Sequence, residues 1–294
     1  MKTQMKTKLA AAITLSLLAA PTFAAPTLYG EIDASIDYLP EDNAKISDKD
    51  VVEVSSNSSF VGLKGEEKLS ERLNAVYAIE WGLSADGYST DWTTRNRFVG
   101  LKDAQLGTLK VGAHDTPLKQ LSSPVDSFNN YVANKADVTG IMTGETRVSN
   151  AVIYESPAIK LPTGALKVNA LLASGEDSGI AKGNGSSKTA GRGLGDAWSA
   201  SVVYDSPLVV AGIAYDKAIP SNFAGRGFLN AATPEVTAAV AGSAFAAANT
   251  LRAIGRVNID GGLALKALYQ TSEVEDAAGN DPAAADIDNA QGWL

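Results

Sequence analysis

Alternation of apolar and polar residues along short segments is the feature that most constrains how this 294-residue chain can fold. Between Thr27 and Tyr38 the even positions are apolar or small, and from Glu31 to Asp37 the odd positions are polar. About eleven segments along the chain repeat this split. Because side chains of a β-strand point alternately to two faces, each segment has one apolar and one polar face. The pattern therefore predicts an all-β protein.

The N-terminus carries the features of an export signal. Lys2, Lys6 and Lys8 precede an apolar run over residues 9–20, and a small-residue site ends at Ala24. The apolar run is shorter than the ~20 residues that span a bilayer, which disfavours a membrane anchor. We expect a signal peptide over residues 1–24, cleaved after Ala24, and a β-barrel domain over residues 25–294.

Composition excludes several classes of protein. Without the three lysines of the signal peptide, 25 basic residues become 22 against 33 acidic ones, a net charge of about −11, which disfavours nucleic acid as a partner. The chain has no cysteine, so no disulfide stabilises it. The one long helix-like apolar run, residues 236–248, is mostly Ala and Gly. It predicts a short loop helix over residues 237–248 or a plain small-residue loop, but no transmembrane helix.

The connections distinguish a membrane barrel from a soluble β-sandwich, which also alternates. Short turns follow residues 61–65, 99–103, 154–157, 204–207 and 259–262, whereas the intervening connections are long, polar and rich in Asp, Asn, Ser and Gly. Outer-membrane barrels have short periplasmic turns and longer extracellular loops, and closure of the barrel pairs every backbone polar group in the bilayer. The asymmetry favours a transmembrane antiparallel up-and-down β-barrel.

Five motifs in order resemble the general trimeric porins of Gram-negative bacteria. They are residues 27–30 (TLYG), 59–66 (SFVGLKGE), 95–101 (RNRFVGL), 107–112 (GTLKVG) and 149–157 (SNAVIYESP). The resemblance implies a 16-stranded barrel, three of which associate side by side, and a third loop that folds into the lumen. About 11 to 12 strands are present in this sequence, so we expect that C-terminal strands are missing; a complete twelve-stranded barrel is the alternative.

The resemblance also implies a constriction between acids of the third loop, residues 115–145, and basic residues on the opposite wall. Asp115, Asp126, Asp137 and Glu145 are the candidate loop acids, and Asp126 is favoured. The motif match puts Arg95 and Arg147 where the family carries constriction arginines. Phe60 and Glu31 stand where the resemblance would allow an arginine and a lysine, so the wall is less basic.

Alternation assigns further charged residues to the water-filled lumen. It places Arg95, Arg97, Lys110 and Arg147 on that face. Glu31 and Glu80 add negative charge to the same interior. These residues predict a transverse field that sorts ions by sign.

The expected function is passive diffusion of ions and small hydrophilic solutes through a water-filled channel. The expected partners are two further copies of the chain, outer-membrane lipid and lipopolysaccharide. A small outer-membrane enzyme is an alternative, because the single histidine, His114, precedes Asp115, but no nucleophile motif accompanies them. A secreted β-sandwich is the second alternative. One His and no Cys predict neither a metal site nor a cofactor.

Overall fold

The computed structural model describes residues 25–39, 50–129, 137–174, 193–224, 226–231, 244–259, 261–275, 281–284 and 287–294. The predicted signal peptide lies outside the described residues. The strands are β1 (Thr27–Glu31), β2 (Ala34–Leu39), β3 (Val51–Ser56), β4 (Phe60–Lys68), β5 (Leu73–Gly82), β6 (Thr93–Asp103), β7 (Gly107–Asp115), β8 (Arg147–Glu155), β9 (Ile159–Leu161), β10 (Gly164–Ala173), β11 (Ala197–Asp205), β12 (Val209–Asn222), β13 (Phe228–Ala231), β14 (Phe245–Ile259), β15 (Leu263–Val274) and β16 (Ile287–Trp293). The helices are α2 (Pro117–Ser122), α3 (Val138–Ile141) and the short 3₁₀ helix η2 (Pro282–Ala284).

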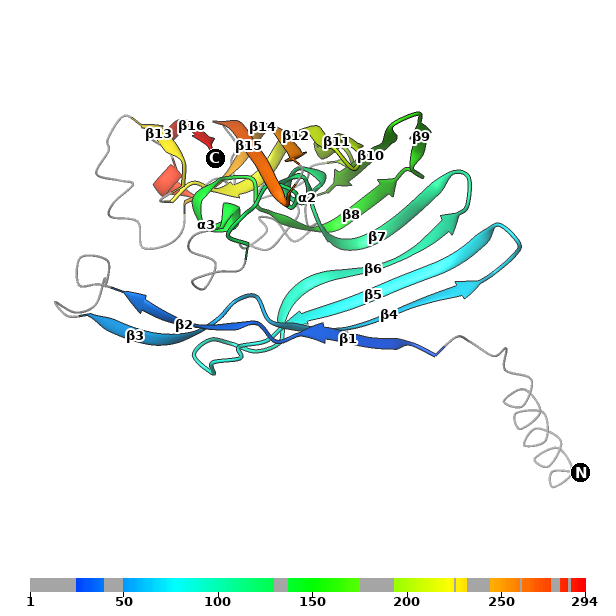
Figure 1. Cartoon of the computed structure of the whole chain (residues 1–294), viewed down its shortest axis with the longest axis horizontal. Helices are drawn as coiled ribbons and strands as arrows, with labels where there is room; N and C mark the ends of the chain where they lie inside the picture. The colour runs from blue at the N-terminus through cyan, green and yellow to red at the C-terminus, as the bar shows by residue number, and fades with distance from the viewer. Residues whose placement is uncertain are drawn as a thin grey trace, which may run out of the picture.

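Neighbouring strands pair antiparallel into one curved sheet of 14 strands, which runs from β1 through β4 to β8 and on to β16 and β13 (Figure 1). β2 and β3 form a separate pair that continues β1 and β4, and the Asn57 amide donates to the Asp33 carbonyl at 2.9 Å where the two pairs meet. Twelve long strands result: β1 with β2, β3 with β4, β5 to β8, β10 to β12 and β14 to β16. The short strands β9 and β13 lie beside these twelve. In the described part of the chain the barrel is not closed, since β1 and β13 end the sheet at opposite edges.

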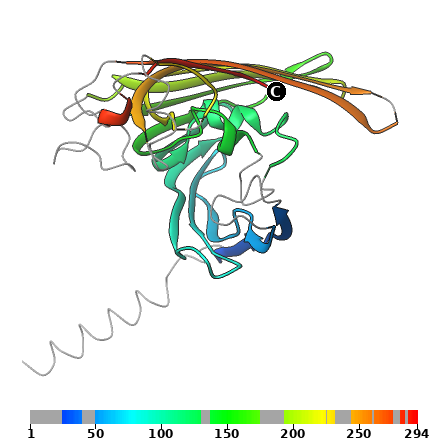
Figure 2. The ribbon, with the colours of Figure 1, turned by 90° about the vertical axis from the view of Figure 1, so that its left-hand side faces the viewer.

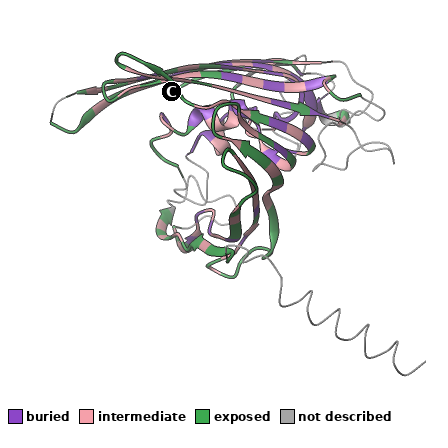
Figure 3. Cartoon of the chain, turned by 90° about the vertical axis from the view of Figure 1, so that its right-hand side faces the viewer, coloured by how far each residue is buried: buried purple, intermediate pink, exposed green. Residues whose placement is uncertain are grey.

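Cross-strand partners lie on the same face of a sheet, and the register gives the two faces different chemistry. Leu63 pairs with Ile79, and Val99 pairs with Val111; all four side chains are exposed on the outer face. On the inner face, polar and small side chains are buried, mainly along β10 to β15. Figure 3 shows buried and exposed residues alternating along these strands. The predicted alternation is confirmed, with apolar side chains facing away from the interior.

Short turns join β4 to β5, β6 to β7, β11 to β12 and β14 to β15 at one end of the sheet. The connections between β5 and β6, β7 and β8, β10 and β11, β12 and β14, and β15 and β16 are longer and lie at the other end, called here the long-loop end. The predicted asymmetry is confirmed. Among the described residues, no helix is long and apolar enough to cross a membrane.

The Ala-rich segment departs from one prediction. Residues 237–243 lie outside the described part of the chain, but Phe245 to Ala248 begin strand β14, so the helix predicted over 237–248 is wrong at its C-terminal end. Ala246 and Ala248 pair with β12, and both side chains are completely buried. Alanine has the highest intrinsic helix propensity, but such propensities are small in energy, and pairing within the sheet overrides them here.

Candidate functional site

Between β7 and β8, the described residues 116–129 and 137–146 fold back along the inner face of the sheet and are called here the inner loop (Figures 1 and 2). Helix α2 begins where the Thr116 hydroxyl accepts the Lys119 amide at 3.1 Å, with Pro117 in its first turn. Helix α3 is capped by Asp137, whose carboxylate accepts the Gly140 amide at 2.7 Å. Both helices are therefore begun by local side-chain caps.

An apolar core attaches the inner loop to the wall. Leu118, Leu121 and Val125 of the loop are buried together with Ile254 of β14 and Leu268 of β15. Helix α2 also contacts β10, β11 and β12. Burial of a leucine side chain contributes about 1.5 to 3 kcal/mol, so the loop is held as part of the folded interior.

A buried polar group reinforces this attachment. Arg252 of β14 has a completely buried side chain that forms an ion pair with Glu145, whose side chain is 2% exposed. The Arg252 guanidinium also donates to the carbonyls of Leu118 at 3.2 Å and Thr143 at 3.0 Å, and to the Gln270 side-chain oxygen at 2.7 Å. Gln270 donates in turn to the Thr143 carbonyl at 2.9 Å. Arg252, Gln270, Thr143 and Glu145 are called here the loop anchor.

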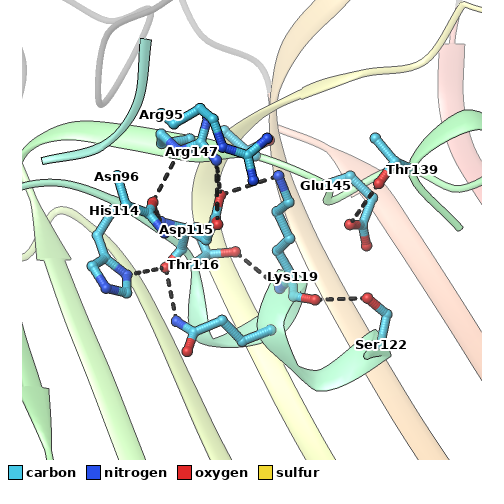
Figure 4. A network of polar contacts seen from close by, with 12 residues as sticks. Arg95, Asn96, His114, Asp115, Thr116, Lys119, Ser122, Thr139, Glu145 and Arg147 are labelled. Atoms are coloured by element: carbon cyan, nitrogen blue, oxygen red, sulfur yellow. Dashed lines mark hydrogen bonds and ion pairs between the residues drawn. The ribbon is translucent and has the colours of Figure 1, made fainter. Parts of the chain in front are cut away.

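Asp115, at the end of β7, gathers the charges at the start of the inner loop (Figure 4). Arg147 of β8 approaches one Asp115 carboxylate oxygen at 3.0 Å, and Lys119 of α2 approaches the same oxygen at 3.1 Å. Arg147 also donates to the Asn96 side-chain oxygen at 2.9 Å, and the Asn96 amide donates to Asp115 at 3.1 Å. The two cations are thereby held side by side, at the foot of the inner loop.

Arg95 of β6 connects the charged group around Asp115 to residues of β4 and β5. Its Nε lies 3.8 Å from a Glu80 carboxylate oxygen, and its guanidinium stacks over the Phe60 ring at 4.7 Å. The Tyr29 hydroxyl donates to the other Glu80 oxygen at 2.8 Å. Arg95, Asp115 and Lys119 line one cavity of about 450 Å³ together with Asp126 and Glu145 of the inner loop.

The inner-loop acids Asp126 and Glu145 differ in the groups that they bind. Asp126, the acid favoured from the sequence, lines that cavity and accepts the amides of Phe128 at 3.3 Å and Val138 at 3.2 Å. Its carboxylate therefore orders the loop backbone as well as facing the cavity. Glu145 lines the cavity too, but its charge is compensated by Arg252.

The prediction that Arg97 faces the lumen is corrected by the register. Arg97 pairs with Ile79 and Ala113 and alternates with Val99, so it lies on the outer face; its guanidinium is 5.7 Å from the Trp81 ring. The cause is a β-bulge, since the pairing of β5 with β6 shifts between Ile79 and Trp81. A bulge sets two residues opposite one, so Arg95 and Asn96 both face Glu80.

Lys110 and Glu31 lie apart from this group. Lys110 is on the inner face, buried over the Phe98 ring at 4.3 Å and paired with Glu155 at 2.6 Å. Glu31 is exposed at the end of β1, opposite Phe60. The structure thus brings together Arg95, Arg147, Glu80, Asp115 and Asp126 among the predicted residues, and places Arg97, Lys110 and Glu31 elsewhere.

The arrangement around the histidine does not form a hydrolytic triad. The His114 ring nitrogen Nδ1 lies 2.9 Å from the backbone carbonyl of Asp115, while the carboxylate of Asp115 is bound by Arg147 and Lys119. The His114 ring packs against Phe98 with 5.5 Å between ring centroids. In the part of the chain that the structure describes, no cluster of His, Asp or Glu side chains could hold a metal ion.

Sequence reasoning did not select Arg252, Gln270, Asn96 or Lys119 as site residues. Each joins segments far apart in the chain, so no local spacing marks it. A long basic residue on the polar face of the Ala-rich strand β14 was the one available signal for Arg252.

An apolar-faced antiparallel sheet with a charged loop folded onto its inner face defines the class of outer-membrane β-barrels. The chain belongs to the Gram-negative porin family, whose family model matches residues 9–293. This membership places it in the outer membrane.

Curated relatives match part of the chain. It is 32% identical over 152 residues to the major outer membrane protein P.IB of Neisseria gonorrhoeae, which covers 50% of this chain and 43% of the relative. It is 33% identical over 171 residues to the major outer membrane protein P.IA of Neisseria meningitidis serogroup C, covering 52% and 43%. These matches span less than half of the length of the curated relatives.

Among solved structures, the anion-selective porin from Comamonas acidovorans aligns with a TM-score of 0.59 and 19% identity, covering 91% of this chain and 71% of that protein. This likeness shows the fold.

Proposed function

We propose that the protein forms a water-filled outer-membrane channel for passive diffusion of ions and small hydrophilic solutes. The observation that carries this proposal is the inner loop, which packs against the inner wall and presents charged residues to a cavity at its foot. A loop in this position narrows the interior without filling it. Its core contacts and the loop anchor keep it there.

The charges beside the cavity support a role in sorting ions. Arg95 and Arg147 come from the wall, and Asp115 and Asp126 come from the end of β7 and from the inner loop. Opposed charges in a narrow aqueous passage create a field across it and attract ions according to sign. We propose these four residues as the constriction, with Glu80 beside Arg95.

Net selectivity follows from competition between the constriction and the whole molecule. The net charge of about −11 after removal of the predicted signal peptide attracts cations, but salt screens distant charge over about 8 Å at physiological ionic strength. We expect weak selectivity at high salt that drifts toward cations on dilution.

Replacing Arg95 and Arg147 together by Ser should shift the reversal potential toward cations and raise conductance, because two bulky cations leave the constriction while Asp115 and Glu80 remain. Single channels in planar bilayers under a salt gradient measure both quantities. The matched control is R72S/K160S, which removes two exposed basic side chains near the short turns. If R95S/R147S behaves like this control, these arginines do not line the constriction.

We further propose that three copies associate side by side in the membrane, in contact with lipid and lipopolysaccharide. The support is the resemblance of the strand motifs to trimeric porins and the apolar outer face. Without cross-linking, unboiled protein in detergent should run as a trimer band that monomer-sized protein replaces after boiling, and chemical cross-linking before heating should preserve the trimer band. A monomer band before and after heating would contradict the assembly.

A further inference from the structure

A second cavity, of about 590 Å³, opens at the long-loop end of the sheet. Its lining includes Trp92 before β6, Asn222 at the end of β12 and Phe245 at the start of β14, together with Arg147 and Arg226. Its volume falls within the range of small-molecule sites, ~300 to 1,000 Å³. It lies at the entrance to the proposed channel and is called here the entrance cavity.

Among the described residues that line the entrance cavity, one cation forms no direct ion pair. Arg147 is paired with Asp115, and Glu145 is paired with Arg252. Arg226 makes no ion pair and no side-chain hydrogen bond with another described residue. Burial lowers the pKa of Arg226, while Glu145 and Asp137 raise it, and a guanidinium stays protonated in proteins. Asp137 also caps helix α3.

Arg226 is held in a defined place. Its amide donates to the Phe223 carbonyl at 3.2 Å, and the next amide, of Gly227, donates to the Ile141 carbonyl at 3.0 Å. Gly227 has a φ of +69°, a conformation that glycine adopts without strain. These bonds tie the segment that carries Arg226 to helix α3 of the inner loop.

The apolar part of the lining is aromatic. Trp92 is 64% exposed, and its ring meets Trp81 edge to face at 6.0 Å. Its backbone has a φ of 62°, which costs a bulky residue about 1 to 3 kcal/mol and occurs mostly at functional positions. Trp92 and Phe245 therefore place two aromatic residues in the lining of a cavity that also holds a cation.

We propose that the entrance cavity binds small aromatic monocarboxylates, with the carboxylate on Arg226 and the ring against Trp92 and Phe245. A guanidinium matches a carboxylate through two parallel hydrogen bonds. Because Glu145 and Asp137 already attract Arg226 without forming a direct ion pair with it, a single added negative charge fits better than a dianion such as phosphate. This inference rests on the proposed channel function and adds to it a class of solute that is enriched at the entrance.

The test uses benzoate added on the long-loop side of channels in planar bilayers. Benzoate should interrupt the current at about tenfold lower concentration than acetate, which lacks the ring, or benzyl alcohol, which lacks the charge. R226Q should abolish this difference, and W92L should weaken it severalfold. R72Q, altered at an exposed turn residue, is the control and should behave as wild type.

A second measurement, tryptophan fluorescence in detergent, does not depend on conduction. Benzoate should quench the emission of the wild type and R72Q, and not that of R226Q. If the protein conducts but benzoate acts alike on wild type and R226Q in both measurements, the proposed site is wrong. If the protein does not conduct and the quenching still requires Arg226, the site stands and the channel function falls.

Discussion

At the scale of single residues, Arg252 shows how one buried cation determines the position of a distant loop. Taking a guanidinium and a carboxylate out of water costs several kcal/mol for each ion, which their attraction offsets only when their other hydrogen-bonding groups are satisfied. The guanidinium of Arg252 meets this condition, since it also donates to Gln270, Leu118 and Thr143. The ion pair between Arg252 and Glu145 therefore contributes more to the position of the inner loop than to the net stability of the fold.

Replacing Arg252 by Met should lower the free energy of unfolding by about 3 to 5 kcal/mol, because Glu145 is left as an uncompensated buried charge. The double variant R252M/E145Q should recover most of this loss, since neither charge remains. Urea unfolding in detergent, followed by fluorescence, measures both. An equal loss in the single and double variants would show that packing, and not charge, is responsible.

Alternation along a strand predicts the face of a side chain only where the pairing of the strands is regular. Arg95 lies beside Glu80, and Arg147 pairs with Asp115, after which the inner loop begins. Arg97 has the same parity as Arg95, yet it faces outward because the bulge opposite Glu80 adds one residue to β6. A bulge is set by how two strands pair, which a count along one strand cannot reveal.

At the scale of elements, the inner loop is organised like a small domain with its own caps and apolar face. Pro117 and the Thr116 cap begin helix α2, and the helix then turns Leu118 and Leu121 toward the wall. The long connection between β7 and β8 was predicted from the sequence, but its packing partners lie on β12, β14 and β15. Local patterns could identify the loop; they could not identify the surface that receives it.

The variant L118A/L121A should loosen the inner loop from the wall, because each leucine to alanine change in a core costs about 2 to 5 kcal/mol. Single channels should become larger in conductance and noisier, as the loop samples positions away from β14. The exposed Leu208, in the turn between β11 and β12, supplies the control L208A, which should conduct as wild type. Unchanged conductance in a folded L118A/L121A channel would argue against narrowing by this loop.

At the scale of the whole molecule, the two faces of the sheet differ in how well they tolerate a charged side chain. Val111 lies midway along β7 and is 49% exposed on the outer face. Leu265 shares that face but lies close to the turn between β14 and β15. Lys266 follows Leu265 and lies on the inner face, opposite Arg256 in the register of β14 and β15.

The change V111R should destabilise the protein by about 2 to 4 kcal/mol, because a charge then enters the hydrocarbon near the middle of the bilayer. L265R should cost about 0 to 1 kcal/mol, since its position near the turn lets the charge reach the interface. K266Q should have an effect no larger than L265R. Unfolding in lipid vesicles gives these values, and an equal cost for V111R and K266Q would mean that the two faces have been exchanged.

The loop anchor joins parts of the chain that are synthesised far apart. Arg252 and Leu118 are separated by 134 residues, and Gln270 and Thr143 by 127. Contacts with such large sequence separation form late, because they require the intervening chain to be ordered first. The inner loop is made early but cannot dock until β14 and β15 have joined the sheet. During biogenesis the passage should therefore first form wide, and should reach its final diameter only when β14 and β15 are in place.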